Sequence, residues 1–188
     1  MKKRKGIWVS VMSNIIYKSN VTIPWETQSA FKMKEYHVNR EDDMIYCYLK
    51  AYVKNGDLIL NSYQFIEEPE GNDSMTVLVR IPFEGSAAGL TVTYGYDGIS
   101  KVEGADCSES DIVFNSYKAD DEQGFYWCGE ITLSESLIEQ TFNTKLTENM
   151  SVGLNLRQNF SDGNYAVLFS LGDSPFDKVA GEFVLMAF

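Results

Sequence analysis

The chain has 188 residues, of which 44% are hydrophobic and 13% aromatic, and its formal net charge at pH 7 is −11. This length and apolar content favour one folded domain and argue against a disordered chain. The acidic charge argues against nucleic acids and anionic membrane surfaces as partners, because like charges repel, but it leaves neutral ligands such as sugars open.

The first twelve residues form a basic leader that fits no targeting segment. Residues 1–6 are basic, and Ile7–Ile16 is apolar only in part, because serine and asparagine interrupt it. A secretory signal needs about 7–15 apolar residues, and a membrane span needs about 20. We therefore expect a cytoplasmic protein with no membrane partner and one domain over residues 13–188. Met12 is an alternative native start.

The predicted elements are short strands separated by turns. The clearest is Met44–Val53, in which apolar residues at odd positions alternate with Tyr46, Tyr48, Lys50 and Tyr52. Asn55-Gly56 follows directly and is typical of a two-residue type I′ hairpin. In chain order, extended segments are expected at 14–17, 21–25, 31–40, 44–53, 58–66, 75–83, 90–96, 112–117, 125–133, 151–158, 165–171 and 181–188.

Polar segments and one short helix complete the predicted order. The stretches 41–43, 67–74 and 84–89 are expected to be turns or loops, as is Lys101–Asp111. Ser136 with Glu139 fits a capping box at the start of a helix that ends near Phe142. The pattern predicts an all-β fold, an antiparallel β-sandwich of about ten strands with one short helix. A lipocalin-like or other up-and-down barrel is the alternative.

Several of these segments follow one another in an order known from a family. A Trp shortly before a Glu leads into a helix, then come a Gly-x-Asn-x-Arg strand and a closing Gly before an apolar strand. The stretches are Met44–Tyr52, Met75–Phe83, Leu90–Tyr96 with Gly98, Trp127–Leu133 with Ser134–Phe142, Gly153–Arg157 and Gly181–Leu185. This order resembles the carbohydrate-binding module family 9-like domains, also called DOMON-like sandwiches, and covers residues 22–188.

The resemblance implies a non-catalytic module that binds a glycan or a glycan-containing compound, without a cofactor. Family members that bind sugars are expected to clamp the sugar ring between exposed tryptophans. Here Trp127 is expected in the core and Trp8 lies in the leader, which leaves Trp25. The expected ligand-binding residues are Trp25, Tyr46, Tyr48, Arg80, Tyr94, Asn155 and Arg157.

The tyrosine-rich strand has two interpretations. Tyr46, Tyr48 and Tyr52 share one face, and tyrosines of neighbouring strands are expected to join them. Such a face can stack on sugar rings and bond their hydroxyls, or it can be ordinary packing. The tyrosines considered for this platform are Tyr46, Tyr48, Tyr52, Tyr63, Tyr94 and Tyr96.

Catalytic and metal sites find less support in the sequence. His37 is the single histidine, which excludes a multi-histidine metal centre within one chain, and we expect it at the surface. Glu130 lies in an apolar strand and is expected to pair with Arg157 or Arg80. Carboxylates that a glycoside hydrolase-like enzyme could use are Glu67, Glu68, Glu70, Glu103, Glu130 and Asp162.

Three further expectations concern ions, nucleotides and thiols. The acidic stretches 67–73 and 120–122 could hold calcium, although neither has EF-hand spacing. No glycine-rich phosphate loop is present, which argues against nucleotides. Cys47 and Cys128 are expected to be buried thiols, with no disulfide framework that includes Cys107. A structural or protein-interaction domain without a ligand site remains the third functional hypothesis.

Overall fold

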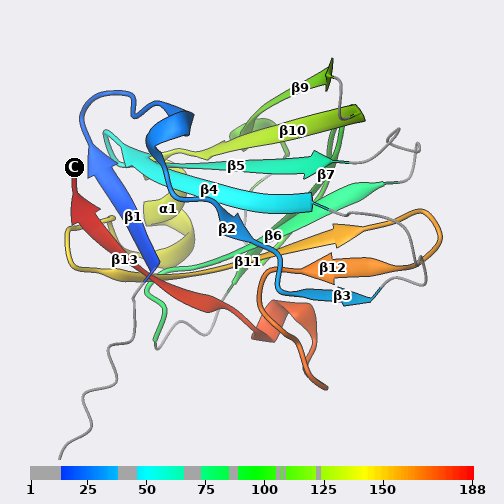
Figure 1. Cartoon of the computed structure of the whole chain (residues 1–188). Helices are drawn as coiled ribbons and strands as arrows, with labels where there is room; N and C mark the ends of the chain where they lie inside the picture. The colour runs from blue at the N-terminus through cyan, green and yellow to red at the C-terminus, as the bar shows by residue number, and fades with distance from the viewer. Residues whose placement is uncertain are drawn as a thin grey trace, which may run out of the picture.

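A computed structural model describes residues 14–37, 46–65, 73–84, 89–104, 107, 109–121 and 124–188. These residues form thirteen strands in one sheet (Figure 1). The strands are β1 (Asn14–Ser19), β2 (Phe31–Lys32), β3 (Glu35–His37), β4 (Tyr46–Lys54), β5 (Asp57–Phe65), β6 (Ser74–Arg80), β7 (Leu90–Gly95), β8 (Gly98–Glu103), β9 (Val113–Asp121), β10 (Gly124–Leu133), β11 (Ser151–Asn159), β12 (Tyr165–Val167) and β13 (Gly181–Ala187).

The sheet folds into two facing layers. One layer has the order β4-β5-β10-β9, and the other has the order β8-β7-β6-β11-β13. Strand β12 pairs with β11, and β3 pairs with β12. Strand β1 joins the layers, because it pairs in parallel with both β13 and β4. At the far ends of the strand order, β8 and β9 touch. The all-β class is confirmed, but the fold is a nearly closed, mixed sheet rather than a purely antiparallel sandwich of about ten strands.

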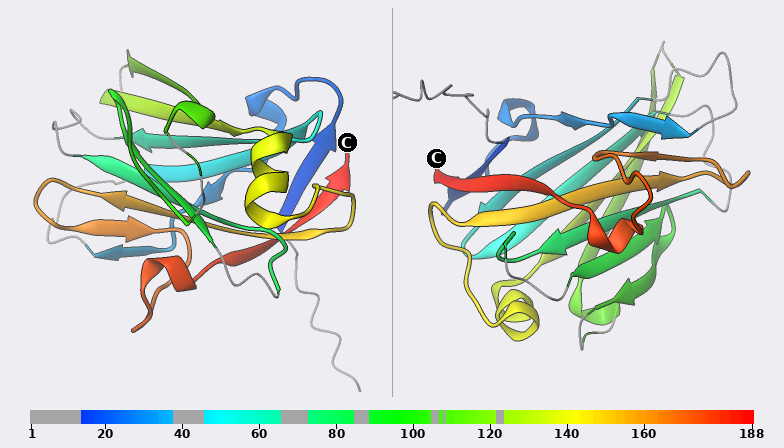
Figure 2. Two further views of the ribbon diagram at one scale, coloured as in Figure 1. Left: turned by 180° about the vertical axis from the view of Figure 1, so that it is seen from behind. Right: turned by 90° about the horizontal axis from the view of Figure 1, so that it is seen from below.

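The described chain also contains the helix α1 (Glu135–Phe142) and the single 3₁₀ turns η1 (Trp25–Thr27), η2 (Glu109–Asp111) and η3 (Phe176–Lys178). In the view from behind, α1 lies in front of the sheet (Figure 2, left). None of the helices in these ranges has the length and apolar character needed to cross a membrane.

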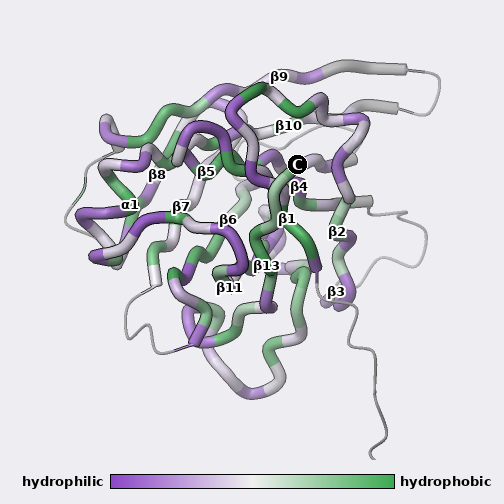
Figure 3. Tube along the Cα trace, turned by 90° about the vertical axis from the view of Figure 1, so that its left-hand side faces the viewer, coloured by the Kyte–Doolittle hydropathy of each residue, from purple (hydrophilic) through white to green (hydrophobic). Residues whose placement is uncertain are grey.

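The core between the layers follows the predicted alternation. On β4, Cys47, Leu49 and Val53 are at most 1% exposed, whereas Tyr48 and Lys50 on the opposite side are half-buried. Trp127 is fully buried, as expected for a core tryptophan. Apolar and polar residues are interleaved along the chain rather than gathered in separate segments (Figure 3), which is the pattern of strands with one buried side.

The turn between β4 and β5 is the predicted one. Asn55 has a φ of 53° and Gly56 a φ of 96°, so both central residues are left-handed, as a type I′ turn requires. The turn sets the register of the hairpin, in which Tyr48 lies opposite Tyr63. The residues of the turn therefore determine which tyrosines of β4 and β5 lie opposite each other.

The predicted helix forms, but its cap differs from the prediction. Ser134, not Ser136, is the N-cap, and its Oγ accepts a 3.2 Å hydrogen bond from the Leu137 amide. Ser134 still has the extended backbone of the preceding strand, which is the geometry of an N-cap. Asn143 ends the helix in the left-handed conformation.

Other expectations need correction. Part of the expected loop Lys101–Asp111 belongs to the edge strand β8. Its exposed polar residues lack the alternation of apolar and polar positions that predicts a strand. The expected extended segment Val21–Trp25 instead leads into η1. The basic leader, the turn at 41–43 and most of the acidic loop 67–74 lie outside the described residues.

Candidate ligand-binding face

Four tyrosines gather on the outer side of the layer β4-β5-β10-β9. The register places Tyr48 beside Tyr63, Tyr63 beside Cys128, and Cys128 beside Tyr117. Tyr126 lies two residues before Cys128 and therefore points to the same side of the sheet. We call the surface formed by Tyr48, Tyr63, Tyr117 and Tyr126 the tyrosine face.

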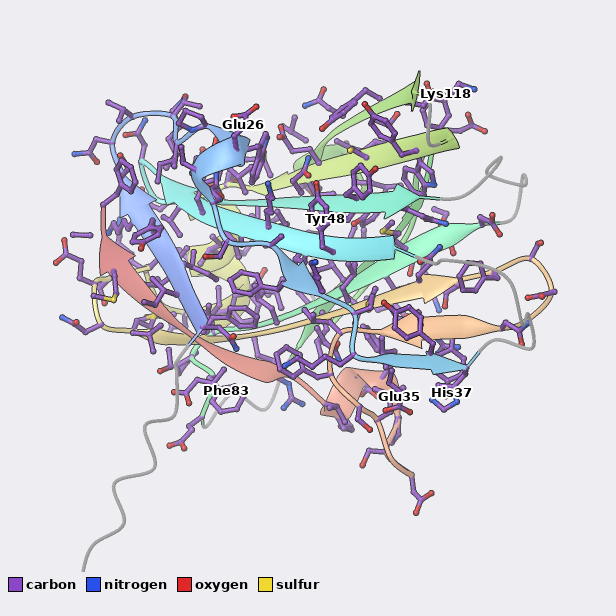
Figure 4. The ribbon with its side chains drawn as sticks, in the orientation of Figure 1. Glu26, Glu35, His37, Tyr48, Phe83 and Lys118 are labelled. Atoms are coloured by element: carbon purple, nitrogen blue, oxygen red, sulfur yellow. The ribbon has the colours of Figure 1, made fainter. Side chains whose placement is uncertain are left out.

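Three of these rings stack on one another. The ring centroids of Tyr48 and Tyr63 are 4.7 Å apart and the rings are inclined by only 2°. Tyr126 continues the row, 5.1 Å from Tyr63 at an angle of 31°. Side chains of a sheet stand roughly perpendicular to it, and Figure 4 shows Tyr48 standing out from β4. The rings therefore cover one another's faces and offer their edges and hydroxyls.

Polar side chains lie directly beside the stacked rings. The register aligns Lys50, Asn61 and Glu130 across three neighbouring strands, one step along from the tyrosines. Nζ of Lys50 lies 5.3 Å from the centroid of the Tyr48 ring, a cation–π contact. Asn61 is only 3% exposed, and its side chain lies beside the Tyr117 hydroxyl. The face thus combines aromatic surface with amine, amide and carboxylate groups.

The turn η1 forms a wall on one side of this face. Nε1 of Trp25 donates a 3.1 Å hydrogen bond to Oε2 of Glu130, and Nζ of Lys50 donates a 2.7 Å hydrogen bond to the Trp25 carbonyl. The indole also packs edge-on against Tyr52, 5.1 Å away. Figure 4 shows Glu26, the next residue, on the turn above β4. Trp25 is therefore held beside the tyrosines by contacts from two strands.

Three ionisable groups at or beside this face have a raised pKa, namely Cys128, Tyr117 and Tyr52. Burial raises the pKa of the Cys128 thiol to about 11, although the Tyr117 hydroxyl and the Lys50 ammonium act in the opposite direction. Burial, followed by the neighbouring Cys128, raises the pKa of Tyr117 above its ordinary value. Burial and the Glu130 carboxylate raise the pKa of Tyr52. Neutral donors and acceptors of this kind suit a neutral ligand.

Two of the expected ligand residues lie in the interior instead. Tyr94 is 1% exposed, and its hydroxyl donates a 2.8 Å hydrogen bond to Oγ of Ser62. Asn155 is 0% exposed, and its Nδ2 donates to the carbonyls of Phe169 and Val179. Both side chains point inward or under a loop, so neither offers a surface to a ligand. The side chain of Tyr46 lies outside the described residues.

The two expected arginines belong to the other layer. The Arg157 guanidinium lies 4.4 Å from the ring of Tyr165, and His37 stacks on that ring at 4.3 Å. Nη2 of Arg80 donates to the carbonyl of Asp177. The expected ion pair of Glu130 with an arginine is wrong, because β10 lies in one layer and both β11 and β6 lie in the other.

His37 is exposed, as expected, and contacts Glu35 (Figure 4). The Ser170 side chain and His37 lower the pKa of Glu35. Within the described ranges, no cluster of three or more His, Cys, Asp or Glu residues could hold a metal ion. The acidic stretch 67–73 lies almost wholly outside those ranges, and so do Glu67, Glu68 and Glu70.

The cysteines behave as expected. Cys47 and Cys128 are 1% and 2% exposed, and neither they nor Cys107 forms a disulfide. The sequence alone does not predict Asn61, Tyr117 or Tyr126 as residues of the site. Their place in the site follows from the strand register, because they lie near Tyr63 or Lys50 only when β4, β5, β10 and β9 are paired.

Solved structures share this fold. A family 9 carbohydrate-binding module from Caldicellulosiruptor kristjanssonii in complex with cellotriose has a TM-score of 0.65 and 11% identity, over 93% of this chain and 94% of that one. Such a module in complex with glucose gives 0.63 and 12%, over 93% and 97%. A Bacteroides uniformis protein described as carbohydrate-binding gives 0.65 and 10%, over 92% and 99%. No family model and no curated protein sequence matches.

Proposed function

We propose that this chain is a non-catalytic carbohydrate-binding module whose glycan lies on the tyrosine face. The observation that carries the proposal is the row of stacked rings of Tyr48, Tyr63 and Tyr126 beside a wall formed by Trp25. The shared fold supports it, because the similar structures include modules in complex with cellotriose and with glucose.

The chemistry of the face matches that of a sugar. A sugar presents apolar C–H surfaces together with many hydroxyl groups, and tyrosine offers an aromatic body with one hydroxyl. Because Tyr48 and Tyr63 cover each other's faces, the ligand would meet their edges and hydroxyls, with Trp25 at its side. Lys50 would supply a further hydrogen-bond donor to sugar oxygens.

The arrangement favours binding over hydrolysis. Glycoside hydrolysis needs two carboxyl groups about 5–10 Å apart on either side of the scissile bond. Glu130 is the carboxylate that the register places beside the tyrosines, and Nε1 of Trp25 already bonds one of its oxygens. Glu130 therefore holds the Trp25 indole at the side of the binding face.

Binding of the purified protein to a glycan array, followed by calorimetry with cellotriose and glucose, tests the proposal. The test variant is Tyr48→Ala, and the matched control is Tyr36→Ala, which removes an exposed tyrosine from the other layer. We expect a glycan that binds the native protein and the control, but binds Tyr48→Ala at least about tenfold more weakly, a loss of about 1.4 kcal/mol.

Two outcomes would contradict the proposal. Absence of binding to any glycan would refute the carbohydrate-binding function itself. Glycan binding that Tyr48→Ala leaves intact and Arg157→Ala abolishes would place the site on the other layer, next to Tyr165 and His37.

A further inference from the structure

In the part of the chain that the structure describes, three polar side chains of the core lack hydrogen-bond partners. Gln64 on β5 and Gln158 on β11 are both 0% exposed, and the nitrogen and oxygen of each amide are unpaired. Nε1 of Trp127, also 0% exposed, is unpaired as well. Buried polar atoms in native proteins nearly always have a partner, either in the protein or in ordered water. Five such atoms in one core therefore call for an explanation.

The register brings Gln64 and Trp127 together. Gln64 is paired with Trp127 on one side and with Cys47 on the other, and all three side chains point into the core. Directly paired residues on one side of a sheet have their Cβ atoms about 4.5–5.5 Å apart. The indole nitrogen and the amide of Gln64 therefore lie in one neighbourhood.

Gln158 reaches the same end of the core from the facing layer. Its partner on β6 is Met75, and the partner of Met75 on β7 is Tyr94. The Tyr94 ring packs edge-on against Trp127, with 6.5 Å between the ring centroids. Because the two layers meet through this contact, the chain of neighbours runs from Gln158 through Met75 and Tyr94 to Trp127 and Gln64.

The chemistry of these groups indicates which kind of molecule could bind to them. The indole nitrogen can only donate a hydrogen bond, whereas each amide both donates and accepts. Among the described residues, the register partners Cys47 and Trp127 of Gln64 and the partner Met75 of Gln158 are uncharged, and burying an unpaired ion is strongly unfavourable. Water is small, donates and accepts, and typically makes two to four hydrogen bonds in a buried site.

We propose that ordered water occupies this end of the core and bridges Gln64, Gln158 and Trp127. The five unpaired atoms offer enough donors and acceptors for about two water molecules. The water would connect the two layers through Gln64 and Gln158, in addition to the direct bond from the Tyr94 hydroxyl to Ser62. This inference does not depend on the proposed glycan site, which lies on the outer side of the sheet.

A crystal structure of the native protein at high resolution tests the inference first. We expect a water peak within about 3.5 Å of at least two of the three groups. Direct hydrogen bonds from both amides to protein atoms, with no water between them, would overturn the inference.

Long-lived internal water can also be counted in solution by oxygen-17 relaxation dispersion. We expect the count to fall in Gln64→Met and Gln158→Met, which keep the side-chain length but remove the amide. The matched control is Gln140→Met, at an exposed position on α1. An unchanged count in both core variants would refute the proposed water site. If either variant fails to fold, the crystal structure of the native protein decides alone.

Discussion

Trp25 and Glu130, which are 105 residues apart in the sequence, are joined by a 3.1 Å hydrogen bond from the indole nitrogen to the carboxylate. The bond attaches η1 to β10 and holds the indole beside the stacked tyrosines. Hydrogen bonds to charged groups are among the stronger ones, so this contact fixes one side of the proposed glycan site.

The first prediction concerns the indole nitrogen. Trp25→Phe keeps an aromatic ring beside Tyr52 but removes the donor to Glu130. We expect glycan affinity to fall about tenfold, because η1 loses one of its two bonds to the face. Calorimetry measures the affinity, with Glu26→Gln as control, since Glu26 is an exposed neighbour on the same turn. Equal affinities of Trp25→Phe and the native protein would show that this bond does not shape the site.

The second prediction separates stacking from hydrogen bonding. Tyr63 is the middle ring of the row, so Tyr63→Ala removes the support of both Tyr48 and Tyr126. Tyr63→Phe keeps the ring and removes only the hydroxyl. We expect the alanine variant to bind glycan at least about tenfold more weakly and the phenylalanine variant to lose clearly less. If phenylalanine costs as much as alanine, the hydroxyl contributes the affinity and the ring row does not.

The third prediction concerns Tyr94 as a core residue. Tyr94→Phe removes the hydroxyl that bonds Ser62, while Ser62 keeps its own 3.1 Å bond to the Gly129 carbonyl. We expect the free energy of unfolding to fall by about 1 kcal/mol and glycan binding to stay unchanged. Urea denaturation measures the change, with Tyr96→Phe, which is only half-buried, as control. A loss of binding at native stability would mean that Tyr94 belongs to the site after all.

The fourth prediction concerns Asn155. Its amide donates to the carbonyls of Phe169 and Val179, and its oxygen accepts from the Phe169 amide. Asn155→Ala leaves these buried groups unpaired, so we expect a loss of about 2–4 kcal/mol in unfolding free energy. Asn115→Ala, at an exposed position on β9, is the control and should change stability by less than about 0.5 kcal/mol. Comparable losses in the two variants would contradict this role.

The fifth prediction concerns pH. The pKa of Cys128 is raised from 9.0 to about 11 in the folded protein, so folding favours the neutral thiol. The resulting stability is fully present below pH 9 and is lost as the pH rises toward 11, because only the unfolded chain ionises there. Cys128→Ala should therefore show a flatter fall in stability between pH 9 and 11. A slope identical to that of the native protein in this range would contradict the assigned shift.

The sequence determined the local features of this protein. Alternation on β4 placed Cys47 and Leu49 inside and Tyr48 outside, because a strand turns each successive side chain to the opposite side. Asn55-Gly56 specified the hairpin, since both residues tolerate positive φ. These properties depend on neighbours in the chain and can therefore be read from it.

Tertiary structure decided which strands become neighbours. Strand β1 joins the two layers by pairing in parallel with a strand of each. No local sequence pattern predicts such a pairing between segments that are far apart in the chain. Pairing of the other strands places Tyr94 in the core and sets Asn61 and Tyr117 beside the predicted tyrosines. It also puts Arg157 and Glu130 in different layers. Strand register is a long-range property, because it results from burying the apolar side of every strand in one common core.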